Sequence, residues 1–332
     1  MIVTRNCAVE LLEVEEPLIE PGHILMKTQY SAVSPGTELT MIGRGYDFPT
    51  PIGYSASGIV LEVGEGVEHV APGDRVACYG GPYVRHAELQ LIPKHLAVKV
   101  PSSVDMKAAA FVGLGAIGIH ALRQGELSFG AIGVIQGLGI LGQIMARIGY
   151  AAGYRIAACD LLESRCALLP RLPGLEVCLE AAELHEAVRR LSDGSGADAV
   201  LICAGGKRAG LIDEGIDMLR DRGTIVVVGD ILTELTRSKM FGKEVKVVIS
   251  RAGGPGRYDA AYEVEGRDYP LGYVRWTEGR NMKEYIRLLE EGRIAVTSLI
   301  NKQARLSDMS DLYGEFASNP AAVVGAIVEY GD

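Results

Sequence analysis

The first hundred residues contain short apolar runs that glycine and proline interrupt. Two such runs extend from Ile24 to Tyr30 and from Ile59 to Val63, and turn-forming residues follow them at Ser34-Pro35-Gly36 and Gly64-Glu65-Gly66. Short strands divided by turn signals of this kind are typical of small β-barrels. The pattern therefore predicts a β-barrel domain over residues 1–105.

From Met106 the pattern changes to apolar strands that alternate with helical stretches. Continuous apolar runs of this kind are typical of a parallel sheet that helices cover on both faces. We therefore predict a doubly wound α/β domain over residues 106–274. Its expected strands are Ile132 to Gln136, Arg155 to Cys159, Ala199 to Cys203, Thr224 to Gly229 and Val245 to Ile249.

Residues 252–276 are rich in glycine, arginine and tyrosine and show neither the period of a strand nor that of a helix. A loop of this length inside a compact chain is usually functional or mobile. Regular structure is expected to resume in the tail, with helices near Asn281 to Glu291 and Asp308 to Ala317 and strands near Val296 to Ile300 and Ala322 to Val328.

The predicted strand that ends at Gln136 leads directly into the run Gly137-Leu138-Gly139-Ile140-Leu141-Gly142. In such a run the first glycine permits a tight turn, the second lets the backbone approach a pyrophosphate, and the third lets the next helix lie close to the sheet. The N-terminus of that helix offers N–H groups to the phosphates. Because a strand precedes the run and helical spacing follows it, we expect a dinucleotide site here.

Asp160 follows the next predicted strand, about 20 residues after the glycines, where a carboxylate can accept hydrogen bonds from both ribose hydroxyls. This carboxylate would repel a 2′-phosphate, so the sequence favours NAD over NADP. Arg165 lies close enough along the chain to leave NADP as an alternative. Two later strand ends, at Cys203-Ala204 and Gly229, either meet the second half of the cofactor or are ordinary turns.

The chain has 332 residues, enough for two domains, and its 48% hydrophobic content fits a folded globular protein. A net charge of -9 without a basic cluster argues against nucleic acid as a partner. No apolar run is long enough for a membrane span, and the first residues do not resemble a signal peptide. Six cysteines without a C-x-x-C pair fit reduced thiols. We expect a cytoplasmic protein that contacts no membrane.

Three features occur in an order that one large family shares: the run 58–64 (GIVLEVG), the run 72–76 (PGDRV) and the glycine-rich turn. In these features the chain resembles the medium-chain dehydrogenase/reductase superfamily over essentially its whole length. The resemblance implies a GroES-like β-barrel catalytic domain at residues 1–105, to which residues 275–332 return, and a Rossmann NAD-binding domain at residues 106–274. It also implies an oxidoreductase that acts on a small-molecule substrate.

A narrower resemblance rests on four runs, namely 34–38 (SPGTE), 51–55 (PIGYS), 254–259 (GPGRYD) and 273–281 (YVRWTEGRN). These runs are similar to the zinc-free dehydrogenase module of bacterial bi-domain oxidoreductases. Those proteins occur in carbohydrate biosynthesis and join the module to a sugar-oxidoreductase domain. The narrower resemblance thus implies a zinc-free enzyme of sugar chemistry.

The zinc-dependent members of the superfamily supply metal ligands from a Cys-Gly-Thr-Asp stretch and a Gly-His-Glu stretch. At the matching positions this chain has Pro35-Gly36-Thr37-Glu38 and Gly53-Tyr54-Ser55, so the thiolate and the imidazole are replaced. The six histidines show no metal-ligand spacing either. We therefore expect no bound metal.

Without zinc, another group must supply the proton that neutralises the alkoxide formed by hydride transfer. Tyr54 stands at the position of a lost ligand, and we predict that its hydroxyl is the general acid, assisted by Thr37 and Glu38. The alternative is that Tyr54 only fills the space of the missing metal.

The loop before the tail contains the predicted substrate-binding residues. Guanidinium groups grip carboxylates or phosphates, and aromatic rings stack on sugar faces. A polyhydroxylated or anionic substrate would suit such side chains. The alternative is a surface loop in which Arg257 pairs with Asp259. The residues concerned are Arg257, Tyr258, Arg275 and Trp276.

The interpretation that follows is a zinc-independent, NAD(H)-dependent oxidoreductase that transfers hydride to or from a sugar-like or cyclic polyol alcohol or ketone. Two other enzyme classes stay open, a quinone or enone reductase and a tetrapyrrole side-chain dehydrogenase. A hypothesis of a different kind is a non-catalytic NAD-binding subunit of a sugar oxidoreductase. The strand from Val245 to Ile249 resembles the edge through which relatives pair their sheets, so we expect a homodimer.

Overall fold

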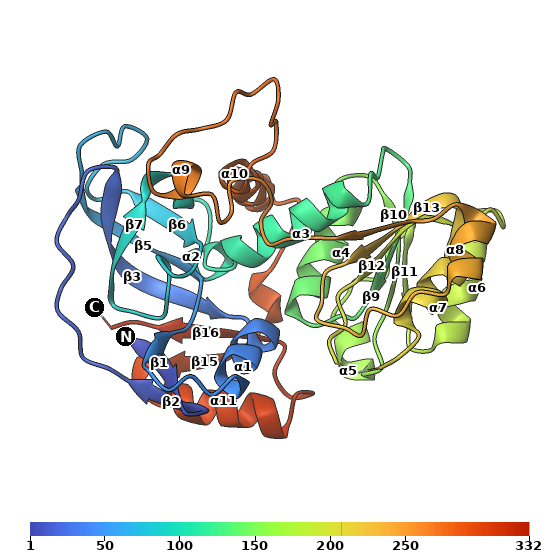
Figure 1. Cartoon of the computed structure of the whole chain (residues 1–332), viewed down its shortest axis with the longest axis horizontal. Helices are drawn as coiled ribbons and strands as arrows, with labels where there is room; N and C mark the ends of the chain where they lie inside the picture. The colour runs from blue at the N-terminus through green and yellow to red at the C-terminus, as the bar shows by residue number, and fades with distance from the viewer. Residues whose placement is uncertain (207, 332) are drawn as a thin grey trace. The chain divides into compact units, whose positions relative to one another are not determined.

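The computed structural model describes residues 1–206 and 208–331, and packing divides the chain into two compact units. The first unit comprises Met1–Ala116 and the chain from Gly253 onward, and the second is Ile117–Ala252. Figure 1 shows the path along the chain, from the first unit through the second and back to the first.

A largely antiparallel sheet forms the framework of the first unit. Its strand order is β15-β16-β3-β5-β6-β8, and β7 pairs with β3. The central strand β3 (His23–Val33) pairs with three others, and register shifts against β5 (Ser55–Val63) bend the pair. The other strands are β6 (Arg75–Tyr79), β7 (Leu89–Pro93), β8 (Ala97–Lys99), β15 (Ile300–Arg305) and β16 (Gly325–Glu329).

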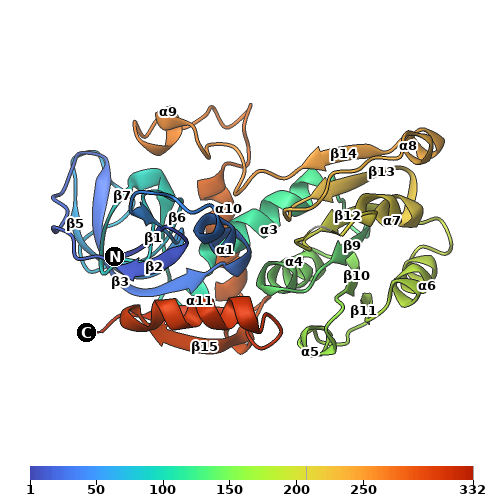
Figure 2. The ribbon, with the colours of Figure 1, turned by 60° about the horizontal axis from the view of Figure 1, so that its bottom comes forward.

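A smaller sheet of order β2-β1-β4 completes the first unit and shares a core with two helices. Figure 2 shows α11 (Met309–Ser318) lying along β15, and its Leu312 and Phe316 join Ile2 in that core. The remaining elements are β1 (Ile2–Arg5), β2 (Ala8–Leu11), β4 (Thr50–Pro51), α1 (Pro35–Gly43), α2 (Met106–Ala109), α9 (Ala260–Glu263), α10 (Glu278–Glu290), η1 (Lys94–Leu96), η2 (Thr297–Leu299) and η3 (Leu306–Asp308).

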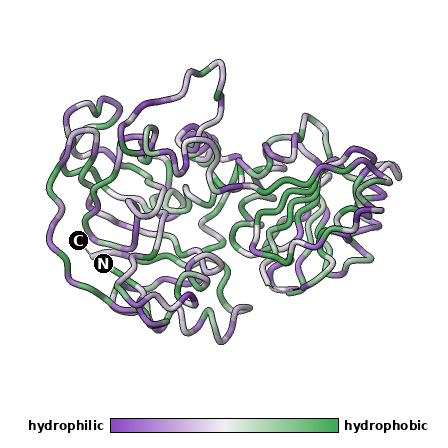
Figure 3. The backbone as a smooth tube through the Cα atoms, in the orientation of Figure 1, coloured by the Kyte–Doolittle hydropathy of each residue, from purple (hydrophilic) through white to green (hydrophobic). Residues whose placement is uncertain are grey.

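The second unit is a parallel sheet of order β11-β10-β9-β12-β13-β14, in which every neighbouring pair is parallel. Counted along the chain this order is 3-2-1-4-5-6, the Rossmann arrangement. Figure 3 shows its strands as a continuous hydrophobic layer, as expected when helices cover both faces. The strands are β9 (Ile132–Gln136), β10 (Arg155–Cys159), β11 (Leu175–Cys178), β12 (Ala197–Ile202), β13 (Leu219–Val227) and β14 (Lys246–Ile249).

Helices α4 (Ile140–Ala151), α5 (Glu163–Cys166), α6 (Ala181–Leu191), α7 (Leu211–Met218) and α8 (Arg237–Lys243) belong to this unit, and the boundary of the two units falls within α3 (Val112–Gln124). The predicted fold class, a GroES-like β-barrel domain plus a Rossmann domain, is confirmed. Among the described residues, no helix combines the length and the apolar character that a membrane crossing requires.

Two predicted elements differ from the structure. The strand expected near Val296 to Ile300 is wrong: η2 occupies that stretch, and β15 begins only at Ile300. Val296 and Leu299 are both buried three residues apart, a spacing that a 3₁₀ turn satisfies as well as a strand would. The short strand β11 was not predicted, because its run alternates apolar and polar residues over only four positions.

The packing division also differs from the expected domain boundaries. We expected the Rossmann domain to extend to residue 274, whereas residues 253–274 pack in the first unit. Polar contacts explain this placement, because Gly253 N donates to Tyr79 Oη and Asn281 Nδ2 donates to Gly253 O. The long loop is therefore bound at its start to β6 and α10.

Candidate functional site

The glycine-rich turn between β9 and α4 places its three glycines in different surroundings. Gly137 has φ +100°, and a methyl group on it would lie 2.7 Å from Ala204 N. A methyl group on Gly142 would lie 1.9 Å from Gly137 O, so the helix reaches the turn only without a side chain there. Gly139 faces open space, and a methyl group on it would have no neighbouring atom within 4 Å. The turn is thus closed on its protein side and open on its outer side.

Helix α4 begins at Ile140, directly after Gly139 as its N-cap. Leu138 and Ile140 are buried in the core, and Leu141 is half-buried. These three side chains therefore fix the turn by packing, and a phosphate could be reached only by backbone N–H groups, with the exception of Leu138 N, which donates to Asp160 Oδ2. The local geometry is that of an anion site at a helix N-terminus.

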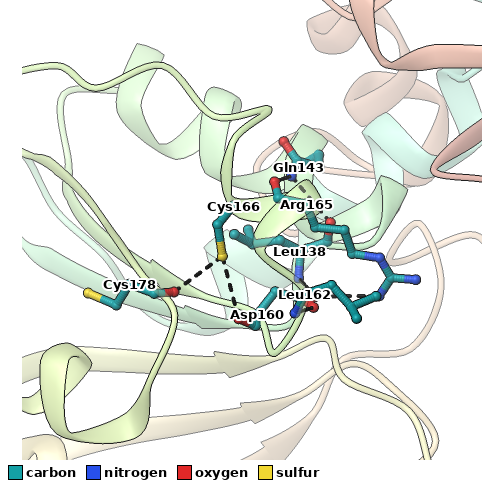
Figure 4. A network of polar contacts seen from close by, with 7 residues as sticks. All are labelled: Leu138, Gln143, Asp160, Leu162, Arg165, Cys166 and Cys178. Atoms are coloured by element: carbon teal, nitrogen blue, oxygen red, sulfur yellow. Dashed lines mark hydrogen bonds and ion pairs between the residues drawn. The ribbon is translucent and has the colours of Figure 1, made fainter. Parts of the chain in front are cut away.

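Asp160 closes the other side of this turn (Figure 4). Its Oδ2 accepts a hydrogen bond from Leu138 N at 2.7 Å, and its Oδ1 accepts one from Leu162 N at 2.9 Å. Arg165 Nη1 lies 3.4 Å from Oδ2, and Arg165 O accepts a hydrogen bond from Gln143 Nε2. Each carboxylate oxygen has two lone pairs; Oδ2 accepts from both Leu138 N and Arg165 Nη1, so Oδ1 is the oxygen that can still accept a ligand hydroxyl.

The structure brings the two later strand ends to the same edge of the sheet. Cys203 N and Ala204 N both donate to Gln136 O, at 2.8 and 2.9 Å. A methyl group on Gly229 would lie 2.1 Å from Ala204 O, so only glycine fits where β13 ends. Gln136 Oε1 is buried there without a hydrogen-bond partner among the described residues. An unsatisfied acceptor beside an open glycine turn fits a site that a ligand completes.

In the first unit, Tyr54 lies between β4 and β5 and is half-buried. Burial raises the pKa of Tyr54 well above its ordinary value, whereas hydrogen bonds with the Ser34 and Thr37 side chains lower it and the Glu38 charge raises it further. The Tyr54 and Tyr79 rings meet edge to face, with centroids 5.8 Å apart. Tyr54 therefore keeps its proton at physiological pH, and the Thr37 side chain is hydrogen-bonded to it.

Glu38 is differently placed from the other two predicted catalytic residues. Its side chain is fully buried, and its Oε1 accepts a hydrogen bond from Ser34 N at 3.1 Å. Its Oε2 is shared by His86 Nε2, at 3.4 Å, and by the Tyr313 hydroxyl. Glu38 thus belongs to a buried polar network and can act on Tyr54 only through its charge.

These residues do not fit a zinc site. The segment that would supply a thiolate has Pro35 to Glu38, and the carboxylate it does supply is already bonded to three groups. In the part of the chain that the structure describes, no three His, Cys, Asp or Glu side chains gather so as to hold a metal ion.

The predicted substrate residues form two arginine–aromatic pairs. The Arg257 guanidinium lies 4.1 Å from the Tyr258 ring centroid, and the Arg275 guanidinium lies 3.9 Å from that of Trp276. Arg257 itself is buried, where it forms an ion pair with Glu263 and donates to Gly81 O. The alternative pairing with Asp259 is wrong, because Asp259 instead caps α9 and accepts a hydrogen bond from Tyr269.

One polar residue near these groups was not singled out from the sequence. Glu278 is the first residue of α10 and is fully buried. Burial, followed by the charge of Glu263, raises its pKa to about 9. An acidic residue in the first turn of a helix normally faces solvent and favours the helix dipole, so no local signal distinguishes this one.

Two family models match the chain. The model described as "Alcohol dehydrogenase GroES-like domain" matches residues 20–120, and the model described as "Zinc-binding dehydrogenase" matches residues 137–264. The two matches fall on the two predicted domain types, in the predicted order.

Several named proteins are similar over most of their length. A sorbitol dehydrogenase of Halalkalibacterium halodurans is 26% identical over 298 residues, which are 79% of this chain and 86% of that protein. A probable D-xylulose reductase A of Arthroderma otae is 25% identical over 90% of this chain and 88% of that protein. Among solved structures, the alcohol dehydrogenase TADH from Thermus sp. ATN1 is 20% identical and superposes with a TM-score of 0.78 over 99% of both chains.

Proposed function

The chain belongs to the medium-chain dehydrogenase/reductase superfamily and is an oxidoreductase, and on this premise we propose that it transfers hydride between NAD(H) and a sugar-like or cyclic polyol, without zinc. The observation that supports the cofactor most strongly is the glycine turn, open at Gly139 and flanked by the Asp160 carboxylate. The names of the similar proteins, sorbitol dehydrogenase and D-xylulose reductase, support a polyol or its ketone as substrate.

The residues of the second unit fit a dinucleotide. A nicotinamide cofactor supplies or accepts the hydride when it is bound. In this proposal the backbone of Gly137 to Gly142 holds the pyrophosphate, Asp160 holds a ribose, and Cys203, Ala204 and Gly229 border the second half of the site. Arg165, paired with Asp160, has its charge partly compensated, which favours NAD over NADP.

Tyr54 is the proposed proton donor. Hydrogen bonds from Ser34 and Thr37 hold its phenol oxygen, and burial keeps the phenol protonated. A group that stays protonated can donate a hydrogen bond to a ketone oxygen and then its proton to the forming alkoxide. Glu38 holds Ser34 N and thereby fixes the start of α1, which bears both hydrogen-bond partners of Tyr54.

The substrate surface follows from the two arginine–aromatic pairs. Because Arg257 is already bonded to Glu263 and Gly81, we assign it to holding the loop and leave substrate contact to Tyr258, Arg275 and Trp276. Tyr258 and Arg275 are exposed, and an arginine stacked on an indole suits a polyhydroxylated substrate.

Calorimetric titration with NADH and with NADPH tests the cofactor. We expect NADH to bind more tightly than NADPH. Asp160→Ala should weaken the binding of NADH about tenfold to a hundredfold, because hydrogen bonds to a charged group contribute about 1.5–3 kcal/mol. Asp221→Ala, which removes an exposed acid from the same unit, should leave binding unchanged. Tighter binding of NADPH would instead favour a quinone or enone reductase.

Metal analysis of the same preparation tests zinc independence, and stoichiometric zinc would refute it. Turnover is then sought among sugars, cyclitols and their ketones. If NADH binds but nothing in that set, nor a tetrapyrrole alcohol, is turned over, the proposal fails in favour of a non-catalytic NAD-binding subunit.

A further inference from the structure

Glu278 occupies an unusual position for an acidic side chain. Thr277 caps α10, so the Glu278 side chain starts in the first turn, and it is 0% exposed. Neither Oε1 nor Oε2 has a hydrogen-bond donor within reach among the described residues. A buried ionised carboxylate without a donor is strongly unfavourable, so its charge state needs an explanation.

The surrounding charges do not balance a second anion. Glu263 is buried as well, and it already forms an ion pair with Arg257. The Glu278 charge also raises the pKa of three phenols, which are neutral at pH 7 and so add no balancing charge. Two carboxylates and one guanidinium would leave one negative charge in the interior. The phenols are Tyr79 on β6, Tyr262 on α9, and Tyr269 in the loop that follows α9.

A proton on Glu278 resolves both difficulties. A protonated carboxyl has an O–H that can donate to Glu263, whereas two carboxylates are both acceptors and can only repel each other. Burial and the nearby Glu263 charge raise the pKa of Glu278 to about 9, in agreement with this arrangement. Glu263 then keeps its charge for Arg257.

The ion pair of Glu263 and Arg257 leads directly to Tyr54. Arg257 donates to Gly81 O, and a methyl group on Gly81 would lie 3.7 Å from Tyr54 Cβ. The neighbouring Gly80 N donates to Tyr54 O at 2.9 Å. The turn at residues 80–81 is therefore hydrogen-bonded to the backbone of Tyr54 and lies beside its side chain, and Arg257 holds that turn.

Gly253 links the same groups from the other side. A methyl group on it would lie 2.7 Å from Tyr79 Cε1 and 3.1 Å from Glu278 Cβ. Glu278 N also donates to Pro255 O at 2.8 Å, so the start of α10 and the loop before Arg257 are joined. A charge that appears on Glu278 would therefore disturb the loop, Arg257 and the turn together.

We propose that Glu278 is a positioning residue for Tyr54: it holds a proton that it shares with Glu263, and this neutral form keeps Arg257 on the turn at residues 80–81. The proposal deepens the function above and rests on it, because Tyr54 matters for turnover only if it is the proton donor. Loss of the proton places two anions beside one guanidinium and draws Arg257 away from Gly81. Tyr54 then loses its fixed position, although its phenol stays protonated.

Infrared spectra of protein with ¹³C-labelled glutamate test the proton directly. The wild type should show the carbonyl stretch of one protonated carboxyl at pH 7, and this band should disappear as the pH passes about 9. Glu278→Gln should lack the band, whereas Glu290→Gln, an exposed glutamate of the same helix, should keep it. A wild type without the band would overturn the proposal. A band that potassium or sodium chloride removes at pH 7 would also overturn it, and would indicate a bound cation instead of a proton.

The ¹³Cζ resonance of Tyr54, identified by its loss in Tyr54→Phe, tests the positioning without any turnover. It should move in the wild type near pH 9 and stay constant in Glu278→Gln. Because burial raises the pKa of Tyr54 beyond this range, the movement cannot be its own ionisation. A Tyr54 resonance that does not move overturns the positioning role, and the wild-type titration decides this even if Glu278→Gln does not fold.

Turnover then separates the two proposals. With a substrate in hand, kcat/KM of the wild type should fall about tenfold per pH unit above pH 9, and that of Glu278→Gln should stay flat. If Tyr54→Phe turns over at the wild-type rate, the proposed proton donor is wrong even where the infrared and resonance shifts are found. If Tyr54→Phe is inactive but Glu278→Gln keeps the alkaline loss, the positioning role is wrong.

Discussion

Replacing Glu278 by glutamine should make the first unit more stable at alkaline pH. The carboxyl has a pKa of about 9 in the folded protein against an ordinary value of 4.5. Between these values the unfolded chain releases a proton that the folded chain retains, so the free energy of unfolding falls by about 1.4 kcal/mol per pH unit. The stability contributed by proton retention is complete below pH 4.5 and is lost as the pH rises through 9.

At pH 7 the free energy of unfolding of the wild type is therefore about 3 kcal/mol lower than at acidic pH. Solvent does not screen this effect, because the Glu278 side chain is fully buried. Glutamine is neutral at every pH, has nearly the same shape, and can donate from its amide to Glu263 as the protonated acid does. It removes the pH dependence and keeps the packing. The difference in stability between Glu278→Gln and the wild type should grow by about 3 kcal/mol from pH 6 to pH 8.5.

Urea unfolding followed by tryptophan fluorescence measures this difference. The single tryptophan, Trp276, lies two residues before Glu278, so its signal reports the unit in question even if the two units unfold separately. Glu290→Gln is the control for a lost negative charge on α10 and should follow the wild type at both pH values. Parallel stabilities of the wild type and Glu278→Gln across this range would refute a retained proton on Glu278.

Four further variants test the remaining assignments. Gly142→Ala should abolish measurable NADH binding in calorimetry, because its methyl group would lie 1.9 Å from Gly137 O. Gly139→Ala should fold normally and lose affinity for NADH only through contact with the ligand. Equal affinity of both variants and the wild type for NADH would contradict the proposed site. Tyr54→Phe should lower kcat by about a hundredfold, the usual contribution of general acid catalysis, with little change in KM. An unchanged kcat would mean that Tyr54 only fills the space of the missing metal. Ile249→Lys, at a 70% exposed position of the edge strand β14, should convert a homodimer to a monomer in sedimentation velocity, and a dimer that survives it does not pair through this edge.

The geometry of the glycine-rich turn at residues 137–142 could be predicted from the sequence because most of its determinants are local. Gly142 meets its constraint within the turn, at Gly137 O, and Gly137 meets its constraint at Ala204, after β12, whereas Gly139 faces open space. The strands before and after the turn have the expected apolar pattern. Asp160 follows at a fixed distance along the chain and reaches Leu138 N by a single hydrogen bond. Apart from the approach of Ala204 to Gly137, these determinants lie close together along the chain, so little else depends on how distant segments pack.

The grouping of Thr37 with Glu38 illustrates the limit of such inference. Both follow Pro35 in the first turns of α1, and a motif places them together, yet neighbours on a helix point about 100° apart. Thr37 is exposed and contacts Tyr54, whereas Glu38 enters the core and meets His86 and Tyr313. Tyr313 lies 275 positions away along the chain, so no local pattern indicates where the Glu38 carboxylate goes.

The alternative interpretation, in which Arg257 pairs with Asp259, fails for a related reason. Asp259 is two residues away and was the nearest carboxylate by sequence, but the N-terminus of α9 uses it as a cap. Arg257 turns instead to Glu263, one helical turn further on, and to Gly81 in a distant loop. The cap of α9 is fixed by local backbone geometry and occupies the Asp259 carboxylate. Arg257 therefore forms its ion pair with the other carboxylate, that of Glu263.

Glu278 has distant partners, as Glu38 does, and shares its surroundings with another carboxylate, as Asp259 does. Its charge state depends on which charged side chains are buried beside it, and only the folded structure shows this. Its sequence neighbours Thr277 and Arg280 describe an ordinary helix start. Removal of either Glu263 or Arg257 would change the protonation expected at Glu278, in opposite directions. Glu263→Gln removes the competing anion and lowers the pKa of Glu278, whereas Arg257→Gln removes a cation that lowers this pKa and so raises it further. The sign of each shift follows from the pocket as a whole, which is why a buried acid at a helix N-terminus can be identified as a proton-holding group only once its neighbours are placed.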